Sequence, residues 1–232
     1  MFNYRDFGLK KDYLYEIIAT TYALTEDGKE IKPNASCMGI KIIEDNQIQI
    51  SPFYSTTTYK NLKENNIIAI NFVDDVYLYA LAALKEKDSS IGLKEFPSDY
   101  YEFKYINSRA MDVPYIKGAW GILIGEVSHE LQKTKLGDLG EVIIPVFKLN
   151  IFFNEKFLET FKLFNRAENL TLEMIILATR LKVAKENNDH TLFDVIHEKI
   201  NDYLGSIKRF GKNKRAIKAI DLVSKYISNL MD

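Results

Sequence analysis

The sequence predicts an α+β protein in which a β-barrel comes first and a three-helix segment follows. The first two thirds of the 232 residues consist of short runs rich in β-branched and aromatic residues, separated by turn signals. After Asn154 the pattern changes to apolar residues at helical spacing. We therefore expect a barrel domain at residues 1–154 and a helical subdomain at residues 155–232 that packs on the barrel.

Seven segments of the first part are predicted strands: Tyr15–Leu24, Met38–Glu44, Gln47–Phe53, Ile67–Val73, Asp99–Arg109, Ala119–Lys133 and Gly140–Phe153. Asp45 and Asn46 indicate a tight hairpin between the second and the third. Asp27-Gly28 and Pro33 are turn signals, so the stretch before Met38 is expected to be a loop. Pro145 has no N–H to donate, which predicts a sheet edge or a bulge at that point of the last strand.

Helices are predicted on both sides of Asn154. Within the first part, "TYKNLKEN" is typical of a short helix, and Asp74-Asp75 suits the start of a second one. The final part contains three amphipathic stretches separated by "NNDH" and "FGKN". Between Phe153 and Arg166 there is no Gly, Pro or Ser, so no flexible linker is predicted.

The composition describes a globular protein without a strong electrostatic preference. Apolar residues make up 47%, charged residues 27%, and the net charge is -1, which gives no bulk attraction to nucleic acid or acidic membranes. The first residues lack the apolar core of a signal peptide, and no stretch approaches the about 20 apolar residues of a membrane span. A single cysteine excludes an internal disulfide. We expect a soluble, cytoplasmic protein without a nucleic-acid or membrane partner.

The sequence offers no catalytic constellation. His129, His190 and His197 are the three histidines, and their spacing does not predict a metal site. Cys37 has no nearby histidine and is interpreted as a small apolar residue. The basic run Lys208–Lys218 is better interpreted as a solvated connection between helices than as a nucleic-acid patch.

Two polar stretches are the most informative part of the chain. "KPNASCMGI" places small polar residues before Gly39, where the missing side chain permits close approach to the backbone. Ser55, Thr56, Thr57 and Thr58 follow a strand and precede a helix start. Hydroxyls and helix N–H groups in this arrangement suit a phosphate, but a hydroxyl that caps the helix at Thr58 explains the pattern equally well.

Four segments together resemble a known family: "YEIIATTYALTEDGKEIKPNASCMGIKI", "SPFYSTTTYKNL", "IAINFVDDVYLYALAAL" and "FNRAENLTLEMIILATRL". They are similar to the mainly archaeal family with domain-of-unknown-function number 447, which belongs with the flavin-reductase-like, FMN-binding split barrels. One departure is Cys37, because the family usually has proline between the Asn-Ala-small run and Met-Gly.

The resemblance implies that FMN lies across a homodimer interface, with one face of its ring open. Asn34, Ala35, Ser36, Met38 and Gly39 would then contact the isoalloxazine edge. The residues implied for the phosphate are Ser55, Thr56, Thr58 and Asn61.

Arg166 and Arg180 are candidates for a cation at the phosphate, since guanidinium pairs with phosphate bidentately. They are fourteen residues apart on one predicted helix, roughly 21 Å along its axis, so both cannot reach one phosphate. Arg180 pairing with Glu173 or Asp74 is an equally good interpretation.

The function implied by the resemblance is that of an FMN-dependent oxidoreductase or flavin reductase, with an electron donor such as NAD(P)H and a small-molecule substrate. FMN carries the electron chemistry, so no side chain needs to act as a general base, and no catalytic residue is assigned. A non-catalytic flavin-binding module and a dimeric interaction scaffold remain as alternatives.

Overall fold

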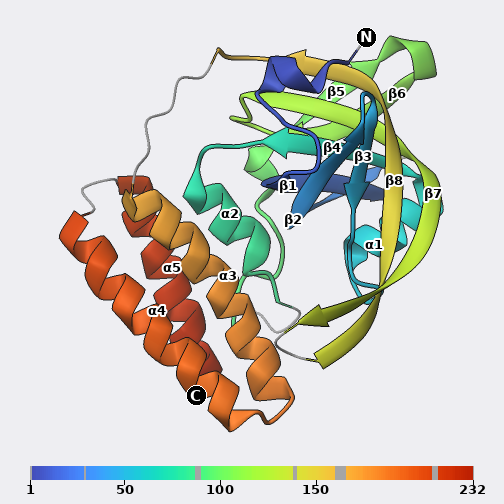
Figure 1. Ribbon diagram of the computed structural model, residues 1–232. Coiled ribbons are helices and arrows are strands. Elements are labelled where there is room, and N and C mark those ends of the chain that lie inside the picture. The colour runs from blue at the N-terminus through green and yellow to red at the C-terminus, as the bar shows by residue number, and fades with distance from the viewer. Residues whose placement is uncertain are drawn as a thin grey trace. The chain divides into compact units, whose positions relative to one another are not determined.

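The computed structural model describes residues 2–28, 30–86, 90–137, 140–159, 166–210 and 214–231. The chain forms two compact units. One unit comprises Met1–Asp74 and Pro97–Thr160, and the other comprises Asp75–Phe96 and Phe161–Asp232. The first is a β-barrel and the second is helical, so the predicted α+β class of a barrel followed by helices is confirmed (Figure 1).

The barrel is closed by six antiparallel strands in the order β1-β2-β3-β8-β7-β4. These are β1 Leu14–Leu24, β2 Ile31–Glu44, β3 Gln47–Ile50, β4 Ile67–Phe72, β7 Gly121–Gly137 and β8 Gly140–Lys156. Alternate residues of each strand face inward, and Ile17, Ile40 and Ile68 are among the fully buried ones. Closure leaves these strands with a shared apolar interior, which is the main core of this unit.

Two short helical segments add side chains to the same core. The 3₁₀ helix η1, Tyr4–Phe7, contributes Phe7, whose ring lies 5.4 Å from that of Phe72. Helix α1, Thr57–Asn65, contributes Leu62, which is fully buried. The predicted helix in "TYKNLKEN" is therefore confirmed, and α1 packs mainly against β1 and also contacts β2.

A separate two-stranded sheet covers part of the outer face of the barrel. It consists of β5, Tyr101–Ile106, and β6, Met111–Ile116. The hydroxyl of Thr20 on β1 donates a 2.6 Å hydrogen bond to the carbonyl of Pro114, and the N–H of Ile116 donates a 2.7 Å bond to Oδ1 of Asn71 on β4. These contacts explain why Thr20 and Asn71 are fully buried although they face away from the barrel interior.

The sequence predicts a strand at Asp99–Arg109, which contains β5, but it does not predict β6. Its Asp112 and Pro114 are residues that strands usually avoid. Pro114 lies opposite Phe103. Hydrogen-bonded and non-bonded pairs alternate in an antiparallel ladder, and this pair is a non-bonded one, so the missing N–H of proline costs no ladder bond. Pro114 therefore does not end the strand.

The prediction of a loop at Pro33–Cys37 is also wrong, because β2 already begins at Ile31. Pro33 lies opposite Tyr22 in the β1–β2 ladder. Hydrogen-bonded and non-bonded residue pairs alternate along an antiparallel ladder. The N–H of Thr25 donates to the carbonyl of Glu30, so the pair of Tyr22 and Pro33 is a non-bonded one. An N–H at position 33 would face away from β1, and its absence costs no bond to β1.

The other two turn and edge predictions are confirmed. Glu44 pairs with Gln47, so Asp45 and Asn46 form a tight turn between β2 and β3. Pro145 lies in a part of β8 that pairs with β7, whereas the pairing of β8 with β3 is confined to Phe147–Asn150. Pro145 is therefore on a sheet edge and not at a bulge.

The helical unit consists of α2 Val76–Ala83, α3 Arg166–Glu186, α4 His190–Phe210 and α5 Lys214–Met231. The three predicted C-terminal helices and the helix after Asp75 are thus confirmed, and Asp75 caps α2 by accepting from the N–H of Tyr77. Helix α2 is apolar almost all round and packs against α3 and α5. Among the helices described, none is both long enough and apolar enough to cross a bilayer.

A carboxylate with little exposure connects the segment after α2 to the helices. Glu86 accepts a 2.8 Å hydrogen bond from the hydroxyl of Tyr226 on α5 and forms an ion pair with Lys182 on α3. Burial, together with the hydrogen bond to Glu86, raises the pKa of Tyr226. The carboxylate therefore joins two helices that are distant in sequence.

Candidate functional site

Helix α1 begins at a hydroxyl that the sequence had marked, although at a different position from the one expected. Thr56, and not Thr58, is the N-cap: its hydroxyl accepts a 3.2 Å hydrogen bond from the N–H of Tyr59. The same hydroxyl donates a 2.7 Å bond to the carbonyl of Phe53. The Thr56 hydroxyl thus acts both as a donor and as an acceptor at the start of the helix.

Thr58 faces into the protein and joins the two polar stretches. Its side chain is 2% exposed, and its hydroxyl oxygen lies 2.7 Å from that of Ser36 on β2. The same oxygen accepts a 3.3 Å hydrogen bond from Nδ2 of Asn34. The structure therefore brings Asn34 and Ser36 of the first polar stretch together with Thr58 of the second.

Two asparagines of α1 extend this polar cluster toward β1. Asn61 is buried and donates a 3.1 Å hydrogen bond to the hydroxyl of Thr21. Asn65 donates to the carbonyl of Tyr22. Side-chain hydrogen bonds to β1 and β2 thus fix the position of α1 along its length, and with it the direction in which its amino end points.

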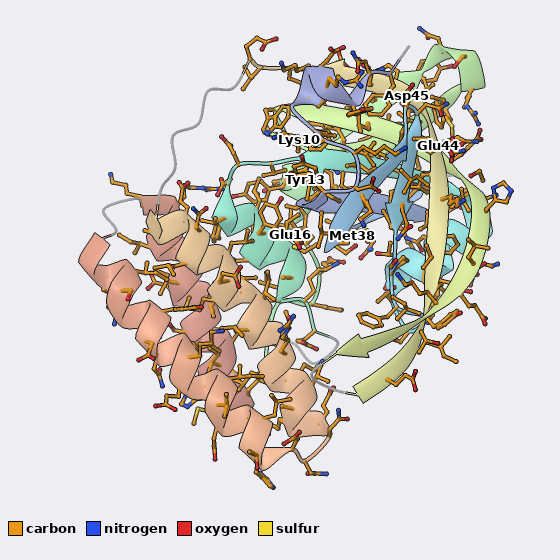
Figure 2. All side chains as sticks on the ribbon, viewed as in Figure 1. Lys10, Tyr13, Glu16, Met38, Glu44 and Asp45 are labelled. Atoms are coloured by element: carbon orange, nitrogen blue, oxygen red, sulfur yellow. The ribbon has the colours of Figure 1, made fainter. Side chains whose placement is uncertain are left out.

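The remaining residues predicted on β2 divide between its two faces. Figure 2 labels Met38 on β2, with Glu44 and Asp45 at the turn that follows. Met38 shares the interior face with Asn34 and Ser36 and packs on the barrel core. Ala35 and Gly39 lie on the opposite face, as does Cys37.

Gly39 does make room for a close neighbour, but that neighbour within this chain is Leu14. A Cβ atom at position 39 would lie 2.7 Å from Cδ1 of Leu14. Leu14 is exposed on β1, and the end of its side chain is free to turn away. The polar cluster under α1 and the space beside Gly39 are therefore on different sides of the sheet.

The two predicted arginines lie on α3, as expected, and thus in the helical unit. Arg180 is exposed, and the side chain of Arg166 lies outside the described residues. A role for either arginine at a phosphate stays a prediction.

Ser55 and Thr57 are exposed on either side of the Thr56 cap. Within the described chain, the N–H groups of Thr57 and Thr58 donate no hydrogen bond, as is usual for the first turn of a helix. Exposed hydroxyls and unpaired N–H groups, with the positive end of the helix dipole, form a set of donors for an anion.

An aromatic and charged group that the sequence did not reveal connects the same helix to β7. The hydroxyl of Tyr59 donates a 2.9 Å hydrogen bond to Glu130 on β7, and Lys63 forms a 2.7 Å ion pair with the same carboxylate. The hydrogen bond from Lys63, aided by that from Tyr59, lowers the pKa of Glu130. Tyr54 packs edge-on against the Tyr59 ring at 5.0 Å.

The aromatic residues stand in the quoted motif, but Glu130 is 71 residues from Tyr59, and no local signal connects them. Phe53, at the start of this stretch, is 53% exposed. No group of three or more potential metal ligands occurs in the ranges that the structure describes.

Comparison with solved structures identifies a match over nearly the whole chain. The FMN-bound protein MM1853 from Methanosarcina mazei has a TM-score of 0.70 and 20% sequence identity, and the match covers 97% of this chain and 100% of that one. The shared fold therefore includes the helices as well as the barrel.

Two further solved structures match with lower scores. The styrene monooxygenase flavin reductase from Pseudomonas putida S12 has a TM-score of 0.42 and 15% identity, over 61% of this chain and 81% of that one. The NADH:FAD oxidoreductase SgcE6 from Streptomyces globisporus has a TM-score of 0.44 and 11% identity, over 66% and 79%.

No curated protein matches the sequence. The model of a family described as "Protein of unknown function (DUF447) N-terminal domain" matches residues 15–140, which include the whole polar cluster under α1 and more than half of the chain. The resemblance seen in the motifs is thus confirmed, and the chain belongs to the DUF447 family.

Proposed function

We propose that the protein binds FMN and is an FMN-dependent oxidoreductase, which takes electrons from a donor such as NAD(P)H and passes them to a small molecule. The observation that carries the proposal is the donor set at the amino end of α1, positioned by β2 through the bond between Ser36 and Thr58. Membership of the DUF447 family and the likeness to an FMN-bound member support the choice of FMN.

The residues present fit the phosphate of FMN. A phosphate dianion is bound by hydrogen-bond donors, and the first turn of α1 offers the N–H groups of Thr57 and Thr58 together with the exposed hydroxyls of Ser55 and Thr57. The hydroxyls of Thr56 and Thr58 serve a different purpose, because they already hold the helix in place. We therefore assign phosphate binding to Ser55, Thr57 and the helix N–H groups.

FMN, when bound, supplies the electron transfer itself. The part of this chain is to position the cofactor: Asn34 and Ser36 hold Thr58, and Thr58 in turn fixes the direction of the helix N–H groups. The Tyr59–Glu130–Lys63 group fixes the exposed side of the same helix to β7. This chemistry needs no general base.

The absorbance spectrum of the purified protein, with the released chromophore identified, is the first test. Titration with FMN and with riboflavin then isolates the phosphate, which riboflavin lacks. We expect FMN to bind more tightly. Ser55→Ala combined with Thr57→Val is expected to weaken FMN binding by at least about tenfold, because hydrogen bonds to a charged acceptor are strong, and to leave riboflavin binding unchanged.

The matched control is Lys214→Ser combined with Lys218→Ser, which alters exposed positions on α5 and is expected to leave FMN binding unchanged. Equal affinity for FMN and riboflavin would contradict the phosphate assignment. Bound FMN without oxidation of NADH or NADPH would identify a non-catalytic flavin-binding module, and a protein that binds no flavin would be an interaction scaffold.

A further inference from the structure

The segment before β1 packs on the barrel through side chains alone. Within the described chain, the backbone groups of residues 2–9 make hydrogen bonds among themselves and with the side chain of Asn3, and none of them bonds to a strand. We call residues 2–9 the strap. Four of its side chains are buried and belong to the same core cluster as the strands, namely Phe2, Tyr4, Phe7 and Leu9.

Backbone contacts with a strand begin only after the strap. Lys11 forms an isolated bridge with Ile42 on β2, and the N–H of Asp12 donates a 2.9 Å hydrogen bond to the carbonyl of Ile42. Residues 2–9 can therefore leave the barrel without breaking a ladder bond. Segments that are held in this way open locally at a lower free energy than the strands of a sheet.

Phe7 fills a space that a glycine leaves at one end of the barrel. A Cβ atom at position 121 would lie 2.9 Å from Cε1 of Phe7, so the ring occupies the place beside Gly121, the first residue of β7. The Phe7 ring lies 5.4 Å from that of Phe72 and 6.1 Å from that of Trp120. Phe7 thus completes a group of three rings, because Phe72 and Trp120 stack on each other.

The backbone of Trp120 holds both places at which the chain leaves the barrel unit, after Asp74 and after Thr160. Its N–H donates a 2.9 Å hydrogen bond to the carbonyl of Phe72, two residues before the first exit. Its carbonyl accepts a 2.8 Å bond from the N–H of Phe157 and a second bond from the next residue, shortly before the second exit. Both exits are thus fixed by the residue whose ring lies beside Phe7.

We propose that the strap opens as one unit while the barrel stays folded, and that its opening loosens both exits at Trp120. When Phe7 leaves, the ring of Trp120 loses a neighbour, and water reaches the backbone bonds of the same residue. The barrel ends of both connections to the helical unit therefore have a fixed and a loosened state, and the strap selects between them. The proposal does not depend on flavin binding.

Hydrogen exchange of the native full-length chain, measured at low urea concentrations, tests the proposal. The N–H groups of Gly8 and Leu9 report on the strap, that of Trp120 on the first exit, and those of Phe157 and Leu158 on the second. We expect all five to exchange through one opening with the same dependence on urea. The N–H groups bonded between β1 and β2 are expected to exchange more slowly, by global unfolding.

Phe7→Ala removes the ring that fills the space beside Gly121. We expect this change to raise the exchange rates of the strap and of both exits by the same factor, at least about tenfold, because a buried phenylalanine contributes strongly to holding its segment in place. The matched control is Phe103→Ala, which removes an exposed ring of the same unit and is expected to leave these rates unchanged.

Gly121→Ala tests the same contact from the barrel side and leaves the strap sequence intact. The added methyl group takes the place of the Phe7 ring, so we expect faster exchange in the strap and at both exits. In the double variant with Phe7→Ala the methyl group has room. The double variant is therefore expected to exchange no faster than Phe7→Ala alone.

Two results would overturn the proposal. If the N–H groups of the strap exchange only by global unfolding, the segment is an inseparable part of the barrel core. If Phe7→Ala speeds exchange in the strap but not at Trp120 and Phe157, the strap opens without loosening the exits.

Discussion

The hydroxyl oxygens of Ser36 and Thr58 lie 2.7 Å apart, across 22 residues of chain. One residue belongs to a strand of the barrel and the other to the first turn of the helix that follows the β3 strand. Because Thr58 is buried, its hydroxyl has no access to bulk water that could replace the bond. The orientation of α1 therefore depends on this contact.

Thr58→Val keeps the shape of the side chain and removes its hydroxyl. Ser36 and Asn34 then lose their partner in a buried place, and we expect the free energy of unfolding to fall by about 1–3 kcal/mol. Thr57→Val, at the exposed neighbouring position, is the control and is expected to change it by less than about 0.5 kcal/mol. Urea unfolding measures the stability of both variants, and the fluorescence of Trp120, which stacks on Phe72 in the barrel, reports it. An equal loss of stability in the two variants would contradict the expectation.

Asn71→Asp is expected to loosen the β5–β6 sheet from the barrel. The side-chain N–H of Asn71 donates a 2.8 Å hydrogen bond to the carbonyl of Ile18, and the side-chain oxygen of Asn71 accepts one from the N–H of Ile116. A carboxylate cannot donate, and its charge would be buried, so we expect a loss of at least about 2 kcal/mol. The same urea titration measures it. Asn46→Asp, at the exposed turn, should be nearly neutral, and a similar loss there would point to a general effect of charge.

Stability is expected to fall at alkaline pH because tyrosines with raised pKa values, Tyr115 and Tyr226 among them, are held in the neutral form. Burial, with the hydrogen bond to Glu102, raises the pKa of Tyr115 to about 12. The unfolded chain loses this proton near pH 10 and the folded chain keeps it, so the stabilisation is complete below about pH 10 and is lost as the pH rises toward about 12. The raised pKa of Tyr226 acts in the same direction in the helical unit.

Melting temperatures measured across this range test the expectation. Tyr115→Phe and Tyr226→Phe should each flatten the alkaline decline, whereas Tyr105→Phe, which alters an exposed ring, should not. Identical declines in all three variants would show that other groups control the alkaline transition.

Removal of residues 161–232 is expected to give insoluble protein. The truncated chain still contains α2, whose residues Val76, Leu78 and Leu81 are buried and would lose α3 and α5 as packing partners. A second variant that also replaces residues 75–96 by a short Gly/Ser linker should be soluble and cooperative, since it retains the barrel unit alone. Size-exclusion chromatography and thermal unfolding compare the two, and a soluble, heat-stable first variant would contradict the prediction.

Most elements were predictable because their signal is local. Alternation in Gln47–Ile50, the apolar run Ile67–Phe72 and the helical spacing after Arg166 all lie within one segment. The two failures both concern strands that contain a proline: Pro33 was interpreted as a turn signal, and β6, which contains Pro114, was not predicted, yet each proline occupies a ladder position that needs no N–H. That position is set by the partner strand, so local sequence alone cannot reveal it.

The candidate site was predictable in part for the same reason. The hydroxyl cluster was visible, but which hydroxyl would cap α1 depends on where the chain leaves β3, and Thr56 took the role given to Thr58. The partners Thr21 and Glu130 come from strands far along the sequence. Nothing in the motif itself points to them.

The division of the chain has a consequence for its synthesis. Residues 75–96 leave the ribosome before β7 and β8 exist, but their partners α3 and α5 emerge only after both of these strands. The apolar helix α2 must therefore wait, without its partners, while more than a hundred residues are translated, about ten seconds at usual rates. A nascent chain stalled before Arg166 would present this helix to chaperones and proteases, and slow translation should lower the yield of the whole protein more than that of the barrel with α2 removed.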